Sequence, residues 1–271
     1  MIAFQKWHGI GNDFVMVDAF TESLPEDLAS LARATCDRRF GVGGDGLILL
    51  APGEKEALRM RMFNPDGSES EMCGNGIRCL ALFARDLGRA GEGAMPVETG
   101  AGTLTVEILA DGRVRVDMGK ARLTRGEVGM TGAPSENFIA QPLNEFSGTA
   151  ISMGNPHVVI FVDDVSVVNL ENVGPALECH PLFPARVNVH FVQIVDHETL
   201  IQRTWERGAG VTLACGTGAC SVAVASFLNG HSKRSVTVRL PGGELDIEYR
   251  EEGRVFMTGR ATHVFDGKWP Q

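Results

Sequence analysis

Cys73-Gly74-Asn75-Gly76 and Cys215-Gly216-Thr217-Gly218 repeat one pattern 142 residues apart. Four further pairs of segments recur in the same order at an offset of 141 to 143 residues: Gly11-Asn12 with Gly154-Asn155, Gly46 with Asn188, Arg61 to Asn64 with Arg203 to Glu206, and Asp111 to Val114 with Glu252 to Val255. Such a series indicates an internal duplication. We therefore predict two domains, 1–118 and 119–260, with residues 261–271 returning to the first as an added strand.

Both halves combine strand patterns with one apolar helix pattern. Residues 103–109 and 113–117 alternate around an Asp-Gly turn, and residues 245–249 and 254–257 repeat this hairpin signal. Residues 76–88 and 219–230 are apolar almost throughout and end in glycine, which is typical of buried helices. The expected fold is α+β: two pseudo-symmetric domains, each a curved, mostly antiparallel sheet around a central helix, with a cleft between them.

Bulk composition limits the classes of function. The chain has 271 residues, of which 44% are hydrophobic and 22% charged, and its formal net charge is −9. This charge argues against a general nucleic-acid or anionic-membrane partner, but a small anionic substrate remains compatible with it. The first residues lack the pattern of an export signal, so we expect a cytoplasmic protein whose six cysteines are reduced thiols.

A cysteine at the start of each apolar helix has a specific chemical use. The first helical turn presents free N–H groups and the positive end of the helix dipole. That environment binds a carboxylate and lowers the pKa of a thiol. Two such cysteines on opposite faces of one carbon can remove a proton from one side and deliver a proton to the other. Cys73 and Cys215 are therefore the candidate acid–base pair of an amino-acid racemase or epimerase.

Cysteines at helix starts can also be purely structural. A single buried cysteine at such a position is usually a small apolar residue, and we assign Cys79 and Cys220 that role. A redox or metal-binding cysteine module is the alternative from another class. The spacings from Cys73 to Cys79 and from Cys215 to Cys220 do not match the close pairs of common zinc sites. We expect neither a metal nor a cofactor.

Five motifs together closely resemble the diaminopimelate epimerase family, and the resemblance covers essentially the whole chain: His8 to Phe14, Phe63 to Glu69, Met72 to Cys79, Gly154 to His157, and Glu206 to Cys220. The resemblance implies interconversion of LL- and meso-2,6-diaminoheptanedioate without pyridoxal phosphate, in the lysine and cell-wall pathway. It also implies diaminopimelate as the small-molecule partner, and a homodimer as the assembly to test.

The resemblance further assigns roles to individual residues. Cys73 and Cys215 would be the two bases, and His157 and Glu206 would tune their pKa values. The reacting carboxylate would be bound by backbone N–H groups of Gly74, Asn75, Gly216 and Thr217. The rest of the substrate would be held by six side chains: Asn12, Asn64, Asn155, Asn188, Glu206 and Arg207. Arg207 suits a bidentate grip on the distal carboxylate.

Three positions depart from the family pattern. Gly46 stands where some members have glutamine, so any substrate contact there would come from the backbone. Val211 often corresponds to glutamate, and Phe265 corresponds in some members to a tyrosine linked to dimer contact. The closest rival function is a related two-cysteine racemase acting on histidine, proline or hydroxyproline. The amide-rich set with Arg207 favours a substrate that has a distal amino-acid group.

Overall fold

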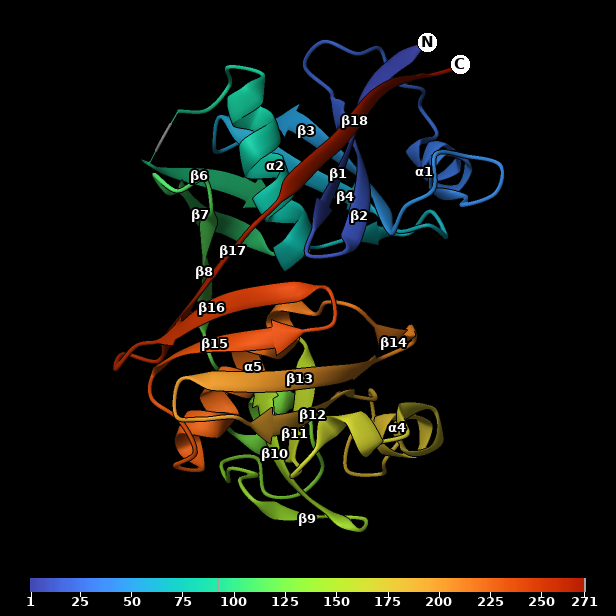
Figure 1. The fold of residues 1–271 in the computed structure, drawn as a ribbon. Helices are drawn as coiled ribbons and strands as arrows, with labels where there is room; N and C mark the ends of the chain where they lie inside the picture. The colour runs from blue at the N-terminus through green and yellow to red at the C-terminus, as the bar shows by residue number, and fades with distance from the viewer. Residues whose placement is uncertain (92, 271) are drawn as a thin grey trace. The chain divides into compact units, whose positions relative to one another are not determined.

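Strands that surround a buried helix form each of two units in the computed structural model, which describes residues 1–91 and 93–270 (Figure 1). The first unit contains residues 1–117 and 258–271, and the second contains residues 118–257. The chain passes from the first unit to the second within β8 (Val114–Lys120) and returns within β17 (Arg254–Gly259). Within the described residues, no helix is both long and apolar enough to cross a membrane.

The first unit is built on a mostly antiparallel set of strands. Its elements before β8 are β1 (Ile2–Gly9), β2 (Asn12–Asp18), α1 (Leu28–Cys36), β3 (Gly46–Pro52), β4 (Leu58–Phe63), β5 (Glu69–Ser70), α2 (Gly74–Asp86), β6 (Gly93–Thr99) and β7 (Gly102–Ile108). The last strand, β18 (Thr262–Trp269), pairs antiparallel with β1, so both ends of the chain lie in this unit (Figure 1). Helix α2 packs against β1, β2, β3 and β7.

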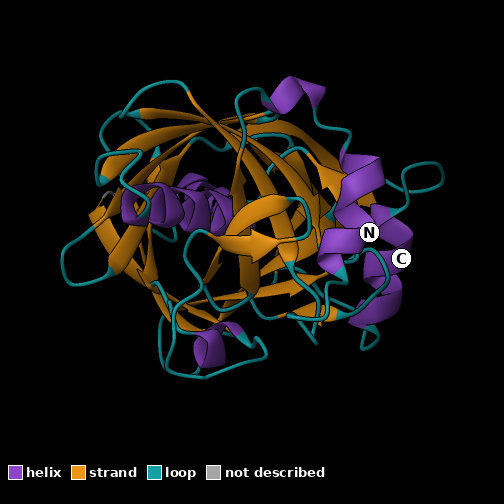
Figure 2. Cartoon of the chain, turned by 90° about the horizontal axis from the view of Figure 1, so that it is seen from below, coloured by secondary structure: helices purple, strands orange, loops and turns teal. Residues whose placement is uncertain are grey.

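The second unit repeats this plan. Its elements are α3 (Arg125–Val128), β9 (Gln141–Leu143), β10 (Phe146–Ser152), β11 (Pro156–Phe161), a 3-10 turn (Val165–Val167), α4 (Leu170–Glu178), β12 (Asn188–Ile194), β13 (Thr199–Glu206), β14 (Gly210–Thr212), α5 (Gly216–Leu228), β15 (Ser235–Leu240) and β16 (Gly243–Tyr249). Helix α5 packs against β10 to β13, β15 and β16. Figure 2 shows strands curving around a helix in this way.

The two units pair their equivalent strands in the same register, as expected for a duplicated domain. The parallel pair β2–β3 aligns Phe14 with Gly46, and the parallel pair β11–β12 aligns His157 with Asn188, at the same repeat offset. The antiparallel pairs β3–β4 and β12–β13 match in the same way. The α+β fold of two duplicated halves, each a curved sheet around one helix, is thus confirmed.

Side chains along the central strands β3 and β12 point alternately to the two faces of the sheet, and both faces are buried. In β3, Leu47 and Leu49 join the apolar core beneath α1, while Ile48 points toward α2. In β12, Val189 and Phe191 likewise belong to the core of the second unit. Each fully buried side chain of this size contributes about 1.5–3 kcal/mol. The intervening position in each strand therefore lies under the helix that begins at a cysteine.

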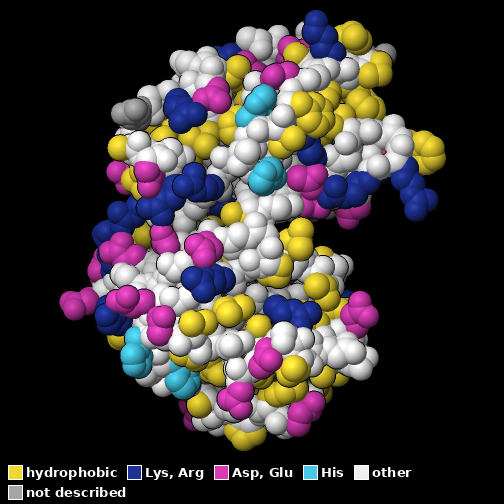
Figure 3. All heavy atoms as spheres, viewed as in Figure 1, with side chains coloured by type: hydrophobic (Ala, Val, Ile, Leu, Met, Phe, Trp, Pro, Cys, Tyr) yellow, Lys and Arg dark blue, Asp and Glu magenta, His cyan; other side chains and the backbone are white. Residues whose placement is uncertain are grey.

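The surface has no large area of one charge on the face drawn in Figure 3. Acidic and basic side chains are interspersed there. Several pairs lie within ion-pair distance, including Arg61 with Glu69 at 2.7 Å and Arg239 with Glu244 at 2.9 Å. On this face, charges of both signs are therefore mixed.

Candidate functional site

Cys73 and Cys215 occupy the same local position in the two units. Each is the N-cap residue of a 13-residue helix, α2 or α5, with extended backbone. The carbonyl of each accepts the first helical hydrogen bond at 2.9 Å, from Ile77 N in one case and Ala219 N in the other. The helices begin at Gly74 and Gly216, two and three residues earlier than the sequence pattern predicts. Both glycines of each motif therefore lie in the first turn, where N–H groups face the N-terminus.

Around Cys73 the structure brings together three of the predicted site residues. The Gly76 N–H donates to Cys73 Sγ at 3.5 Å, and that sulfur lies 3.7 Å from Asn12 Oδ1. The Asn75 amide also donates to Asn12 Oδ1, at 3.2 Å. Asn12, Cys73 and Asn75 thus form one contiguous group, with the backbone of Gly74 between the last two.

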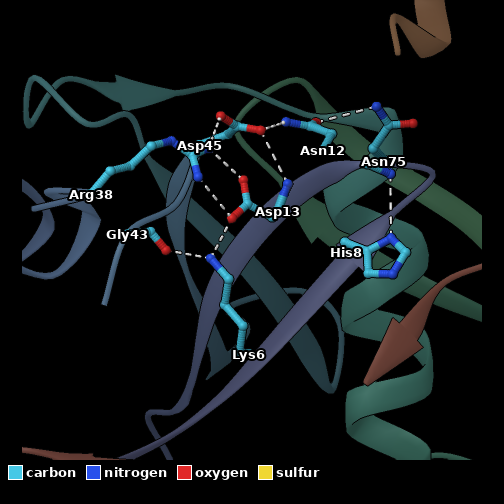
Figure 4. Close-up of polar contacts among 9 residues, drawn as sticks. Lys6, His8, Asn12, Asp13, Arg38, Gly43, Asp45 and Asn75 are labelled. Atoms are coloured by element: carbon cyan, nitrogen blue, oxygen red, sulfur yellow. Dashed lines mark hydrogen bonds and ion pairs between the residues drawn. The ribbon is translucent and has the colours of Figure 1, made fainter. Parts of the chain in front are cut away.

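A network of charged side chains holds the Asn12 amide in place (Figure 4). The Asn12 amide donates to Asp45 Oδ2 at 2.6 Å, and Arg38 donates to both Asp45 and Asp13. Lys6 also donates to Asp13, at 2.5 Å. Burial alone would raise the pKa of Asp13, but these bonds and the positive charges outweigh it and lower that pKa. Sequence reasoning did not identify this network, which holds Asn12 in one orientation.

Arg78 is a second residue that sequence reasoning missed. It is fully buried in α2, where its guanidinium donates to Gly74 O at 3.0 Å and to Asn75 Oδ1 at 2.9 Å. An arginine within an otherwise apolar helix was the available signal, because buried charges need specific partners. Arg78 positions the Asn75 amide so that its nitrogen faces Asn12.

Asn64 and Gly46 lie at the same end of the first unit's strands as Asn12. Asn64 follows β4 and donates to Ser68 Oγ at 2.9 Å, and Gly46 begins the neighbouring β3, which runs parallel to β2. A Cβ at Gly46 would lie 3.0 Å from Phe63 O and from Met62 Cε. A longer side chain at this position therefore requires the neighbouring strand to move.

In the second unit, the predicted residues form linked pairs. Asn188 Oδ1 accepts from the Arg207 backbone N–H at 3.0 Å, and the Asn188 amide donates to Pro156 O at 2.9 Å. Glu206 Oε1 accepts from the Thr212 hydroxyl at 2.6 Å. One guanidinium nitrogen of the exposed Arg207 donates to Ala185 O at 3.0 Å. Val211 is exposed, beside this turn.

A buried polar group lies beneath Cys215. His157 Nε2 bonds Asn155 Oδ1 at 2.9 Å, and His157 Nδ1 lies 2.9 Å from His190 Nε2. Burial lowers the pKa of His157 well below its usual value, and it lowers the pKa of His190 to about 3. Both imidazoles are therefore neutral at neutral pH. The Cys215 sulfur itself lies 3.8 Å from the Thr217 hydroxyl.

Comparisons of the sequence with known proteins point to one family. The family model described as diaminopimelate epimerase matches residues 4–124 and 149–264. The chain is 54% identical to a diaminopimelate epimerase of Desulforudis audaxviator, over 98% of each chain. It is 51% identical to a diaminopimelate epimerase of Moorella thermoacetica, over 98% of this chain and 99% of the relative.

Solved structures share the fold at low sequence identity. A phenazine biosynthesis protein of the PhzF family from Bacillus anthracis superposes with a TM-score of 0.72, at 17% identity over 98% of each chain. A hydroxyproline epimerase from Agrobacterium vitis gives 0.68, at 16% identity over 98% of this chain and 90% of the other. These likenesses concern the fold alone. The family model and the relatives at about 50% identity decide the assignment: this chain is a member of the diaminopimelate epimerase family.

Proposed function

We propose that this protein interconverts LL- and meso-2,6-diaminoheptanedioate by a two-base mechanism in which Cys73 and Cys215 exchange protons with one α-carbon. The observation that carries this proposal is the repeated N-cap cysteine, on α2 and on α5, in a member of this family. The reaction is that of an isomerase in the biosynthesis of lysine and of a peptidoglycan precursor. It needs no cofactor in this mechanism.

The proton transfers balance over one turnover. The thiolate of one cysteine takes the α-proton and becomes a thiol, and the electron pair left on carbon is delocalised into the adjacent carboxylate. The thiol of the other cysteine then gives its proton to the opposite face and becomes a thiolate. In this proposal, first-turn N–H groups of Gly74, Asn75, Gly216 and Thr217 stabilise the carboxylate charge. The next turnover runs from the reversed protonation state.

The remaining assigned side chains fit the other end of the substrate. That end carries an ammonium and a carboxylate, so its recognition needs acceptors, donors and one charge of each sign. Arg207 retains guanidinium donors beyond its bond to Ala185, and a carboxylate suits their planar geometry. Glu206 supplies a negative charge, and Asn64, Asn155 and Asn188 supply amides. Asn12 Oδ1 lies 3.7 Å from Cys73 Sγ, which supports the proposal that Asn12 orients Cys73 and substrate together.

Isotope exchange with single cysteine variants tests this mechanism. We expect Cys73→Ser and Cys215→Ser each to abolish inversion. Each variant should still exchange the α-hydrogen of one isomer with deuterium from solvent, and the two variants should prefer opposite isomers. Cys179→Ser, at the exposed end of α4, is the matched control and should behave as wild type. Equal exchange from both isomers in both variants would exclude the two-base assignment.

A second candidate function is racemisation of a smaller amino acid such as proline, hydroxyproline or histidine. A hydroxyproline epimerase shares the fold, and a pair of cysteines can invert the α-carbon of these amino acids by the same chemistry. Deuterium uptake at the α-carbon distinguishes the two. Uptake with one of these three amino acids and none with diaminopimelate would replace the substrate proposed here.

We further propose that the protein acts in the cytoplasm as a homodimer. Two apolar residues of β18, Val264 and Phe265, are 52% and 45% exposed and are suitable contacts for a second copy. Light scattering measures the assembly directly. A monomer at micromolar concentration would contradict the dimer.

A further inference from the structure

Equivalent positions beneath the two cysteines carry different chemistry. Ile48 and His190 correspond in the repeat, because Ile48 aligns with Met62 across β3–β4 and His190 aligns with Thr204 across β12–β13. Four apolar residues of the first unit are replaced by four polar residues in the second, and all eight are buried: Phe14, Ile48, Met60 and Met62 against His157, His190, Gln202 and Thr204.

Burying polar groups costs stability unless they are hydrogen-bonded. The first unit shows that the same scaffold folds with a hydrocarbon layer at these positions. The polar layer of the second unit therefore serves a purpose other than stability. Its location beneath Cys215 connects that purpose to the sulfur.

The hydrogen bonds of this layer define the tautomers of both imidazoles. Asn155 Oδ1 can only accept, so His157 carries its proton on Nε2 and presents the Nδ1 lone pair to His190. His190 Nδ1 in turn accepts from Gln202 Nε2 at 3.1 Å and lies 3.0 Å from the Thr204 hydroxyl. The Gln202 Oε1 atom is buried and has no hydrogen-bond partner among the described residues.

Cys215 adds a sulfur to the two imidazoles. One ring nitrogen of His157, one of His190 and Cys215 Sγ all lie within 4.8 Å of one another, and all three residues are buried. Gly218 makes this approach possible: a Cβ there would lie 2.9 Å from His190 Nε2 and 3.0 Å from Cys215 Sγ. Two neutral nitrogens and one thiolate sulfur are the ligand types that Zn²⁺ prefers.

We propose that Cys215, His157 and His190 form a binding site for a thiophilic divalent cation such as Zn²⁺, and that its occupation withdraws Cys215 from proton transfer. The inhibitory effect rests on the proposed function, but the binding does not. Zn–N bonds of about 2.0–2.1 Å and a Zn–S bond of about 2.3 Å require the sulfur to move about 1 Å toward the imidazoles.

The groups around the ligands can adjust to a bound cation. Ligating histidines usually donate their second ring N–H to an oxygen. His157 makes that bond to Asn155 Oδ1. His190 would move its proton from Nε2 to Nδ1, and a flip of the Gln202 amide would bring the unpartnered Oε1 to accept it. Binding to a Cys215 thiol releases one proton to solvent, and binding to its thiolate releases none.

Cobalt binding tests the site without relying on activity. Metal-free protein with reduced thiols is titrated with Co²⁺, followed by absorbance and by calorimetry. We expect one Co²⁺ per chain and a thiolate-to-cobalt charge-transfer band, both reversed by Zn²⁺. The band should disappear in Cys215→Ser and persist in the matched variant Cys73→Ser, because the first unit offers Phe14 and Ile48 in place of the imidazoles. Gln202→Met should weaken binding about 10–100-fold, as loss of a supporting group does.

His190→Ile supplies a second and independent check. Isoleucine is the residue at the corresponding position of the first unit, Ile48, so the variant should pack well. Thermal melting verifies that it folds. We expect cobalt affinity to fall at least about 100-fold, because removing a ligand weakens binding more than removing a group that supports a ligand. Unchanged affinity in folded His190→Ile, a band that survives in Cys215→Ser, or no binding by wild type would each overturn the site. Catalysis by metal-free wild type, measured separately, decides the proposed function.

Discussion

Gly218→Ala tests how tightly the helix entry constrains Cys215. The added Cβ would lie 2.4 Å from His190 Cε1 and 3.0 Å from Cys215 Sγ. Carbon atoms in contact are normally about 3.5–4.0 Å apart, so these groups must separate by about 1 Å. His190 and Cys215 are both buried, so the added Cβ presses on the imidazole and on the sulfur together.

Two opposing contributions set the change in stability. Alanine gains about 0.5–1 kcal/mol over glycine within a helix. Overpacking of a buried site costs about 1–3 kcal/mol. We expect a net loss of about 1 kcal/mol, which lowers the melting temperature by about 2–4 °C for a unit of this size.

Activity should fall far more than stability. A misplacement of about 1 Å at a reacting group can cost about 100-fold in rate. We therefore expect Gly218→Ala to lower kcat about 100-fold, measured by deuterium exchange starting from each stereoisomer.

Gly76→Ala is the matched control in the other unit. Its Cβ would lie 2.6 Å from Ile48 Cδ1, the end of a flexible side chain, and 3.4 Å from Cys73 Cβ. Ile48 can rotate away, so kcat should fall less than about 5-fold. Wild-type activity in Gly218→Ala, or equal losses in both variants, would refute the reasoning.

Further predictions concern buried and exposed side chains elsewhere in the units. Arg78→Met leaves Asn75 Oδ1 without its 2.9 Å donor, so the free energy of unfolding in urea should fall by about 1–3 kcal/mol; an unchanged midpoint would contradict this. Iodoacetamide at pH 8 should modify exposed Cys179 quickly and Cys79 only after unfolding, since burial raises the Cys79 pKa to about 12; peptide mass spectrometry reads the order. Glu178→Ala removes the acceptor of Gly208 N at 3.0 Å beside the proposed substrate arginine, so KM should rise about 10-fold with kcat nearly constant; a loss confined to kcat would argue otherwise.

Much of the fold could be predicted from the sequence because duplication is a pattern within one chain. The repeated Cys-Gly-x-Gly motifs identified both helix entries and the equivalence of the halves. The helix starts were placed two and three residues too late, because glycine disfavours helix interiors. In the structure, the cysteine N-caps allow the glycines into the first turn.

Of the polar layer beneath Cys215, only His157 was predicted. His190, Gln202 and Thr204 lie in strands whose alternation resembles that of ordinary half-buried strands, and the contacts of His190 join it to residues of neighbouring strands. A signal did exist in the repeat. The two copies differ at three corresponding positions. His190, Gln202 and Thr204 of the second half stand where the first half has Ile48, Met60 and Met62.

Similarly, no spacing rule predicts the bond that fixes Asn12, because Asp45 reaches it across 33 residues. The Arg78–Asn75 bond, by contrast, joins positions i and i+3 of one helix, a spacing that brings side chains together. Residue type identified the amides as candidates, but only three-dimensional packing assigns Asp45 to Asn12.

The pairing of β18 with β1 has a consequence for synthesis on the ribosome. Residues 118–257 are continuous in sequence, so the second unit can fold as soon as they have emerged. The first unit lacks a strand until the final residues are released, and until then β1 is an open edge that carries Ile2 and Phe4. The half that is translated first is therefore the half that matures last. A chain truncated after residue 257 would contain the complete Cys215 unit together with an N-terminal unit whose β1 edge is unpaired by β18.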